Sequence, residues 1–253
     1  SSHFHLYLIV ESVEQLADFM EYLDSNLARE LGRIYDWRQK LWAKPYSVIP
    51  VSDEPEAQIA RLKYLIGNSV KEQLVEKVAQ WPGLHAAQEI LGDRPLVGTW
   101  VNRTYLYRQR GRKIDPEKAR SPETLKLAKL PCWAHLSDLD YRARIAELVD
   151  QVEAEARIER EATGKRVLGR KAVLRRHPHY APPREKRSPI PLFHAASRET
   201  RRRMREAFKA FLDAYRLASA RLREGHLDVA FPEGSFPPAL PFVPAVRAGP
   251  SMA

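Results

Sequence analysis

Apolar residues recur every three or four positions over several long stretches, and this periodicity most constrains the fold of the chain. Over residues 12–32 it predicts an amphipathic helix that Ser12 caps and Gly32 ends. Similar patterns, several of them opened by serine or acidic residues, predict further helices from Ser52, at roughly 70–80, at 84–92, from Ser137 and from Ser197. Several amphipathic helices are therefore expected.

Two stretches are typical of β-strands. Residues 3–10 are apolar, β-branched and aromatic, and residues 44–51 are similar but include Pro50, which suggests an edge strand. Side chains of a strand alternate between its faces, so His3, His5 and Tyr7 would share one face. Strands together with helices indicate an α+β protein.

Composition narrows the class of protein. With 44% hydrophobic residues in 253, the chain can bury a sizeable core. Its single cysteine, Cys132, excludes a disulfide framework and a zinc site built on several cysteines. No apolar run approaches the roughly 18 residues of a membrane helix, and no signal sequence is evident, so a cytoplasmic protein is expected.

The basic charge is confined to the later part of the chain. Residues 1–100 carry 10 basic and 14 acidic side chains, whereas residues 101–253 carry 32 basic and 18 acidic ones. The net charge of +10 therefore arises entirely after residue 100. Such a patch suits a nucleic-acid partner, because neutralising phosphates releases counterions, although a well-solvated surface has the same composition.

Two pairs of residues could carry chemistry. His3 and His5 would project from one strand face, where two neutral imidazoles can reach one divalent ion. Tyr64 and Asn68 lie one helical turn apart. Each of these four residues, taken alone, is also common in ordinary packing or on a solvent-exposed surface. Their occurrence together is therefore the stronger indication of a functional site.

This combination resembles the REP-associated branch of the HUH single-tyrosine transposases. The family has a histidine-hydrophobe-histidine strand and, further on, a helix with a motif close to R-Y-I-H-x-N-P-V, which residues 3–6 and 63–70 resemble here. Leu41-Trp42, Tyr46-Ser47-Val48, Leu74-Val75 and Trp81-Pro82 also follow the family's order. Ile66 and Ser69 replace the motif's histidine and proline.

The resemblance implies a fold and a domain organisation. Residues 1–98 would form an α+β HUH domain, an antiparallel sheet with packed helices, that lacks the family's usual first strand and helix. Residues 99–253 would form a basic, mainly helical extension with a Pro-rich tail. The resemblance also implies a bacterial, nucleoid-associated protein and leaves open whether it acts as a monomer or a homodimer.

The resemblance further implies a reaction and roles for residues. His3, His5 and Asn68 would bind Mg²⁺ or Mn²⁺, and Tyr64 would attack single-stranded or hairpin DNA to form a 5′-phosphotyrosine. DNA contacts are expected from basic residues beside Tyr64 and from a later basic run interleaved with tyrosines: Lys63, Lys71, Arg108, Arg110, Arg112 and Lys113. Two alternatives remain: a catalytically degenerate DNA-binding remnant, and an unrelated helical scaffold with a chance His-x-His.

Overall fold

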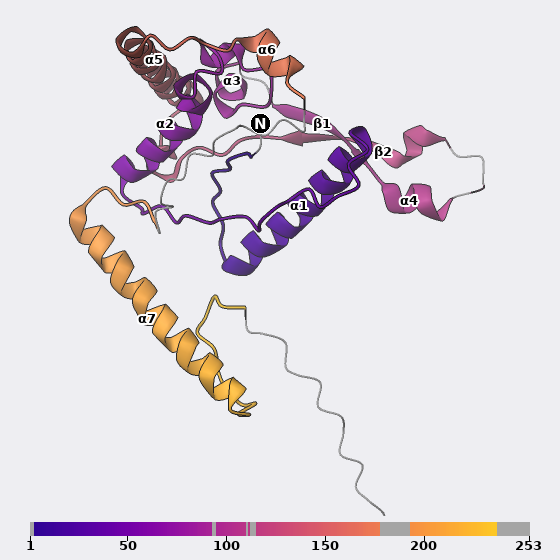
Figure 1. The fold of residues 1–253 in the computed structure, drawn as a ribbon, viewed down its shortest axis with the longest axis vertical. Coiled ribbons are helices and arrows are strands. Elements are labelled where there is room, and N and C mark those ends of the chain that lie inside the picture. Colours follow the sequence, from indigo (N-terminus) through magenta and orange to yellow (C-terminus); the bar gives the residue numbers. More distant parts are fainter. Residues whose placement is uncertain (1–2, 93–94, 110, 112–114, 178–192, 237–253) are drawn as a thin grey trace, which may run out of the picture. The chain divides into compact units, whose positions relative to one another are not determined.

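A computed structural model describes residues 3–92, 95–109, 111, 115–177 and 193–236 (Figure 1). The chain divides into two compact units, which are described separately. The first unit comprises Ser1–Tyr7 and Ile49–Ala196, and the second comprises Leu8–Val48 and Ser197–Ala253. The structure is α+β, with helices predominating and a small antiparallel sheet, so the expected class is confirmed at this level. The expected domain boundary at residue 98 stays a prediction.

The core of the first unit lies between helices α2 (Pro55–Lys71), α3 (Ala86–Leu91) and α5 (Asp138–Thr163). Proline at the first position of α2 suits a helix start, because proline has no amide hydrogen to leave unpaired there. On the apolar side of α2, Leu62 and Ile66 are buried and Ile59 packs at the edge of the core. Ile145 of α5 and Ile66 are among the most deeply buried side chains.

Helix α2 and helix α5 approach each other closely at Gly67. A Cβ atom at this position would lie 3.1 Å from Cγ1 of Val152 and 3.2 Å from its Cβ. Glycine therefore lets the two backbones come nearer than alanine would. This close contact fixes α2 against the core and sets the direction of its opposite face.

The helix expected at roughly 70–80 is not present. Helix α2 ends at Lys71, and Gln73 follows with a positive φ of 56°. The chain then turns back, with the amide of Leu74 donating to the carbonyl of Ser69 at 3.0 Å. Only the 3₁₀ helix η1 (Val78–Gln80) follows. Burial of Val75 and Val78 in the core explains the apolar pattern without a continuous helix.

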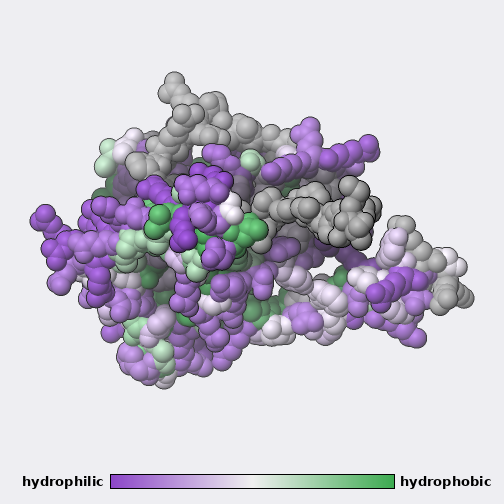
Figure 2. Space-filling model, turned by 90° about the horizontal axis from the view of Figure 1, so that it is seen from below, coloured by the Kyte–Doolittle hydropathy of each residue, from purple (hydrophilic) through white to green (hydrophobic). Residues whose placement is uncertain are grey.

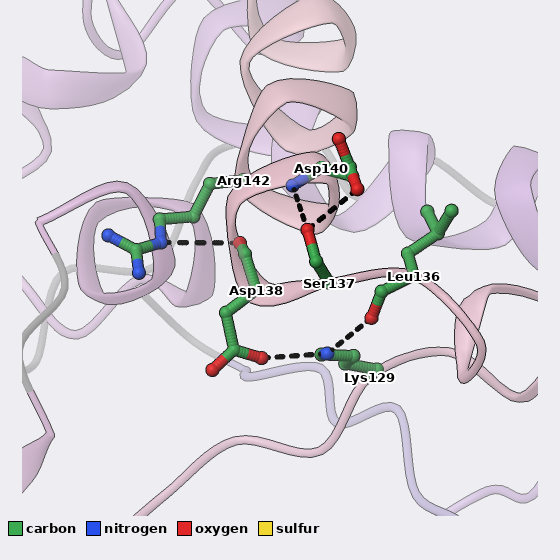
Figure 3. Close-up of polar contacts among 6 residues, drawn as sticks. All are labelled: Lys129, Leu136, Ser137, Asp138, Asp140 and Arg142. Carbon is green, nitrogen blue, oxygen red and sulfur yellow. Dashed lines mark hydrogen bonds and ion pairs between the residues drawn. The ribbon is translucent and has the colours of Figure 1, made fainter.

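Helix α5 begins as its sequence predicts. The amide of Asp140 donates to the Ser137 hydroxyl at 3.1 Å, and that hydroxyl donates to the Asp140 carboxylate at 2.6 Å (Figure 3). Lys129 reaches the same helix start, with Nζ 2.7 Å from Oδ1 of Asp138 and 2.6 Å from the Leu136 carbonyl. The helix ends at Gly164, whose φ of 64° suits glycine. Helix α6 (Arg170–Arg175) follows, and residues 178–192 lie outside the described part.

The sheet forms in a region where the sequence predicts no strand. Strands β1 (Leu96–Val101) and β2 (Arg120–Leu125) pair antiparallel, with Leu96 opposite Leu125 and Val101 opposite Arg120. Between them lie α4 (Arg103–Arg108) and the 3₁₀ helix η2 (Pro116–Ala119). Cross-strand pairing, which local periodicity does not reveal, determines this element.

Neither expected strand forms part of this sheet. Residues 3–10 are extended but are not assigned to a strand, and over 44–51 the structure has only an isolated parallel bridge between Val51 and His194. The local sequence is suited to a strand, but a strand also needs a neighbouring chain that accepts and donates its hydrogen bonds. The prediction of strands at these two places is wrong.

The second unit contains the two long amphipathic helices. Helix α1 (Val13–Ile34) is capped by Ser12, whose hydroxyl accepts from the Gln15 amide at 3.1 Å. It runs two residues past Gly32, the expected end. Helix α7 (Arg198–Arg223) is capped by Ser197. A short 3₁₀ helix in the first unit, η3 (Pro131–Trp133), completes the helical elements of the described residues.

Hydrophilic side chains predominate on the face shown in Figure 2, with smaller apolar groups between them. In the part of the chain that the structure describes, no helix is long and apolar enough to cross a membrane.

Candidate functional site

The candidate nucleophile lies on the exposed side of α2. Leu62, Ile66 and Val70 face the core, and Tyr64, which points away from them, is 39% exposed. Because the packing of Gly67 against Val152 fixes the helix, the position of the Tyr64 side chain follows from the core beneath it. The tyrosine is thus held on a rigid element and remains accessible.

The N-terminal histidines lie against this tyrosine. The centroids of the His5 and Tyr64 rings are 5.8 Å apart with an interplanar angle of 78°, an edge-to-face arrangement. The His3 and His5 rings are 5.0 Å apart at 80°. Tyr7 packs against the core and anchors the extended segment. The structure therefore brings His3, His5 and Tyr64 together, although the segment that carries the two histidines is not a strand.

The environment of His5 favours its neutral form. Burial lowers the pKa of His5 below its usual value, and the neighbouring His3 and Arg61 lower it further. A neutral imidazole keeps a lone pair for a metal ion or a proton. Burial also raises the pKa of Tyr7, with Arg61 acting in the opposite direction. Tyr7 is thus kept protonated, as its packing role requires.

Two cations flank the Tyr64 ring. Cζ of Arg61 lies 4.6 Å from the ring centroid, and Nζ of Lys71 lies 5.7 Å from it. Both distances fall within the range of cation–π attraction. Lys71 was expected as a DNA contact from the sequence, whereas Arg61 was not expected. Its i, i+3 spacing from Tyr64 was the available signal.

Asn68 follows Tyr64 by one turn and is half-buried. Its backbone carbonyl accepts a hydrogen bond from the Glu72 amide at 3.1 Å as α2 ends. Among the described residues, no three His, Cys, Asp or Glu side chains are grouped so as to hold a metal ion. The metal site predicted from His3, His5 and Asn68 therefore stays a prediction, of which the structure shows the two imidazoles side by side, with ring centroids 5.0 Å apart.

The other residues that were expected to contact DNA lie in different settings. Lys63 pairs with Glu155 of α5, with Nζ 2.7 Å from Oε1, so its charge already has a protein partner. Arg108 is exposed in the last turn of α4. The remaining predicted contacts, Arg110, Arg112 and Lys113, lie outside the described residues.

His194 is a further residue that the sequence analysis did not identify. Its backbone bonds to the segment before α2: its amide donates to the Pro50 carbonyl and its carbonyl accepts from the Ser52 amide, both at 2.8 Å. Nε2 of its ring is buried and has no hydrogen-bond partner among the described residues. Burial, and then Arg61, lower the pKa of His194. Its link to the site depends on tertiary contacts, which leave no local sequence signal.

Comparisons of the chain with protein-family models, with characterised proteins and with solved structures found no match.

Proposed function

We propose that this protein is a metal-dependent tyrosine nuclease and strand transferase that cleaves and rejoins single-stranded or hairpin DNA, like the HUH single-tyrosine transposases it resembles. The observation that supports this most is the contact between His5 and Tyr64, whose ring centroids are 5.8 Å apart. The resemblance requires a histidine pair and a tyrosine from distant parts of the sequence to meet, and here they do.

In this proposal the Tyr64 hydroxyl attacks a DNA phosphorus atom. The tyrosine oxygen loses its proton and forms a bond to phosphorus, and the bond from phosphorus to the 3′ oxygen of the preceding nucleotide breaks. That oxygen takes up a proton and leaves as a 3′-hydroxyl, so one proton is released and one is consumed. One phosphoester replaces another, so the reverse attack by a 3′-hydroxyl rejoins DNA without an energy source. Covalent catalysis of this kind needs a positioned and activated hydroxyl.

His3, His5 and Asn68 would hold Mg²⁺ or Mn²⁺ in this site. When bound, the ion supplies Lewis acidity toward the phosphate oxygens. The neutral state of His5, which burial favours, suits a ligand. Asn68 suits the third position because its helical spacing places it on the same side of α2 as Tyr64.

DNA binding would draw on the basic excess after residue 100 and on Lys71 beside the tyrosine. Arg108 on α4 offers an exposed charge next in sequence to Tyr107, whose ring is 68% exposed and suits base stacking. Lys63 can join these contacts only by giving up its ion pair with Glu155.

A second candidate is a DNA-binding protein of the same descent that no longer cleaves. The observation that favours it is the extended state of residues 3–10, which are not held in a sheet as the resemblance implies. Without a ladder of hydrogen bonds beneath them, His3 and His5 are less firmly positioned.

A covalent-trapping assay separates the two candidates. The protein is incubated with a pool of 3′-labelled single-stranded hairpin oligonucleotides and Mn²⁺, then resolved on a denaturing gel. The nuclease proposal expects label to migrate with the protein, and to disappear in Tyr64→Phe while that variant still binds the pool. Tyr22→Phe, which removes the hydroxyl of an exposed tyrosine on α1, is the matched control and should retain the adduct.

The metal assignment is tested in the same assay. His3→Ala and His5→Ala should lose most of the adduct and regain part of it at raised Mn²⁺, because a weakened site needs more ion. Label that still migrates with the Tyr64→Phe variant would overturn the assignment of Tyr64 as the nucleophile. Adduct that still forms in the presence of a chelator would overturn the proposal that the reaction needs a metal ion. Binding without an adduct from the wild-type protein would support the second candidate.

A further inference from the structure

Arg61 is a half-buried guanidinium in an unusual setting. It lies over the Tyr64 ring, and it is close enough to influence the titration of His5, Tyr7 and His194. Within the part of the chain that the structure describes, no carboxylate forms an ion pair with it. The carboxylates of Glu155 and Asp138, for example, pair with Lys63 and Lys129 instead.

A partly desolvated arginine is stabilised by an anion. Burial lowers the pKa of Arg61, which shows that its charge has lost part of its hydration, and the nearby Tyr64 and Tyr7 only partly offset this. A guanidinium matches carboxylate or phosphate oxygens with two parallel N–H donors. The side chains around it are the rings of Tyr64, Tyr7, His5 and His194, and none of these is a carboxylate that would compete for the guanidinium.

A second cation makes phosphate the better match. Nζ of Lys71 lies 5.7 Å from the same ring that Arg61 covers at 4.6 Å. The positive charges of Arg61 and Lys71 repel each other, and an anion bound near both would offset this repulsion. An anion bound by either cation would lie beside the Tyr64 side chain.

We propose that Arg61, assisted by Lys71, binds the DNA phosphodiester that Tyr64 attacks. Arg61 would hold two non-bridging oxygens and so orient the phosphorus toward the tyrosine oxygen. This assignment rests on the proposed function and adds a substrate-binding residue to it. A structural role, in which Arg61 only supports the Tyr64 ring, is the competing explanation that the experiment must exclude.

The test measures DNA binding without cleavage. In the Tyr64→Phe background, binding of a fluorescent hairpin oligonucleotide pool is followed by anisotropy over a range of salt concentrations. Adding Arg61→Gln should weaken binding at least fivefold and reduce the slope of log affinity against log salt by about one. The matched control is Arg144→Gln, which removes one charge from an exposed arginine on α5 and should change neither quantity.

An unchanged salt slope in Arg61→Gln would overturn the proposal, whatever its effect on stability, because a structural role removes no phosphate contact. Should Arg61→Gln fail to fold, Arg61→Lys replaces it. This variant keeps the charge and loses the paired donors, so it should retain the slope and bind more weakly than arginine. Affinity equal to that of arginine would overturn the proposal. Failure of the proposed cleavage would show separately, as wild-type protein that binds the pool without forming an adduct.

Discussion

The close approach of α2 and α5 leads to a quantitative prediction about Gly67. In Gly67→Ala the new methyl group would lie 3.1 Å from Cγ1 of Val152. Overpacking of a core costs about 1–3 kcal/mol, and the better helix propensity of alanine returns up to about 1 kcal/mol. We therefore expect Gly67→Ala to lower the free energy of unfolding by about 1 kcal/mol.

The companion variant Val152→Ala shows whether this contact is the cause. It removes both γ-methyl groups and leaves the Cβ contact at 3.2 Å, which a small shift of the helices can relieve. In this background Gly67→Ala should cost at least about 1 kcal/mol less than in the wild-type protein, a coupling typical of contacting residues. Urea denaturation of the four proteins, followed by fluorescence of Trp81 and Trp133 near this core, measures it. Additive effects would refute the argument from close packing.

Two further predictions concern stability. Burial lowers the pKa of His85, whose Nδ1 accepts from the Ala87 amide at 3.3 Å and whose Nε2 lies 3.2 Å from the Ile66 carbonyl. As the pH falls, His85 therefore takes up a proton in the unfolded chain before it does so in the folded protein. Its contribution to the free energy of unfolding is fully present above pH ~6.5 and is lost as the pH drops toward the lowered pKa, by at most about 1.4 kcal/mol per pH unit. Unfolding at pH 7.5 and 5.5 should show a smaller loss in His85→Gln than in wild type, and equal losses would contradict this. Ile145→Ala deletes three fully buried carbons worth about 0.8 kcal/mol each and leaves a cavity, so it should cost about 3–4 kcal/mol. Leu217→Ala, at a side chain 65% exposed, should stay within about 0.5 kcal/mol, and a similar cost for both would refute the assignment of the core.

The helices were the predictable part of the fold. Ser12, Ser137 and Ser197 cap the long helices α1, α5 and α7, because a side-chain oxygen that accepts from a free amide is a local signal. The strands were predicted in the wrong places. Residues 3–10 have strand-like side chains but no place in the sheet, whereas β2 contains Pro122 and charged residues and forms because β1 pairs with it.

Some residues of the candidate site could be predicted from the sequence and others could not. The grouping of His3, His5 and Tyr64 was expected from a resemblance in motif order, and the structure places these rings together. Arg61 could have been suspected from its spacing to Tyr64, but its position over the ring depends on the side-chain arrangement. His194 reaches the site through backbone bonds to the segment before α2, far away in sequence, so no local pattern could reveal it.

Mass spectrometry of the trapped adduct shows which residue carries the DNA, and so whether Tyr64 is the nucleophile. The wild-type protein is reacted with the hairpin pool and Mn²⁺, treated with nuclease and protease, and its peptides are sequenced. The proposed function predicts a nucleotide linked through a 5′-phosphate to the peptide that contains Tyr64, and to that tyrosine within it. A nucleotide on any other residue, or unmodified Tyr64 in protein that carries the label, would contradict the account.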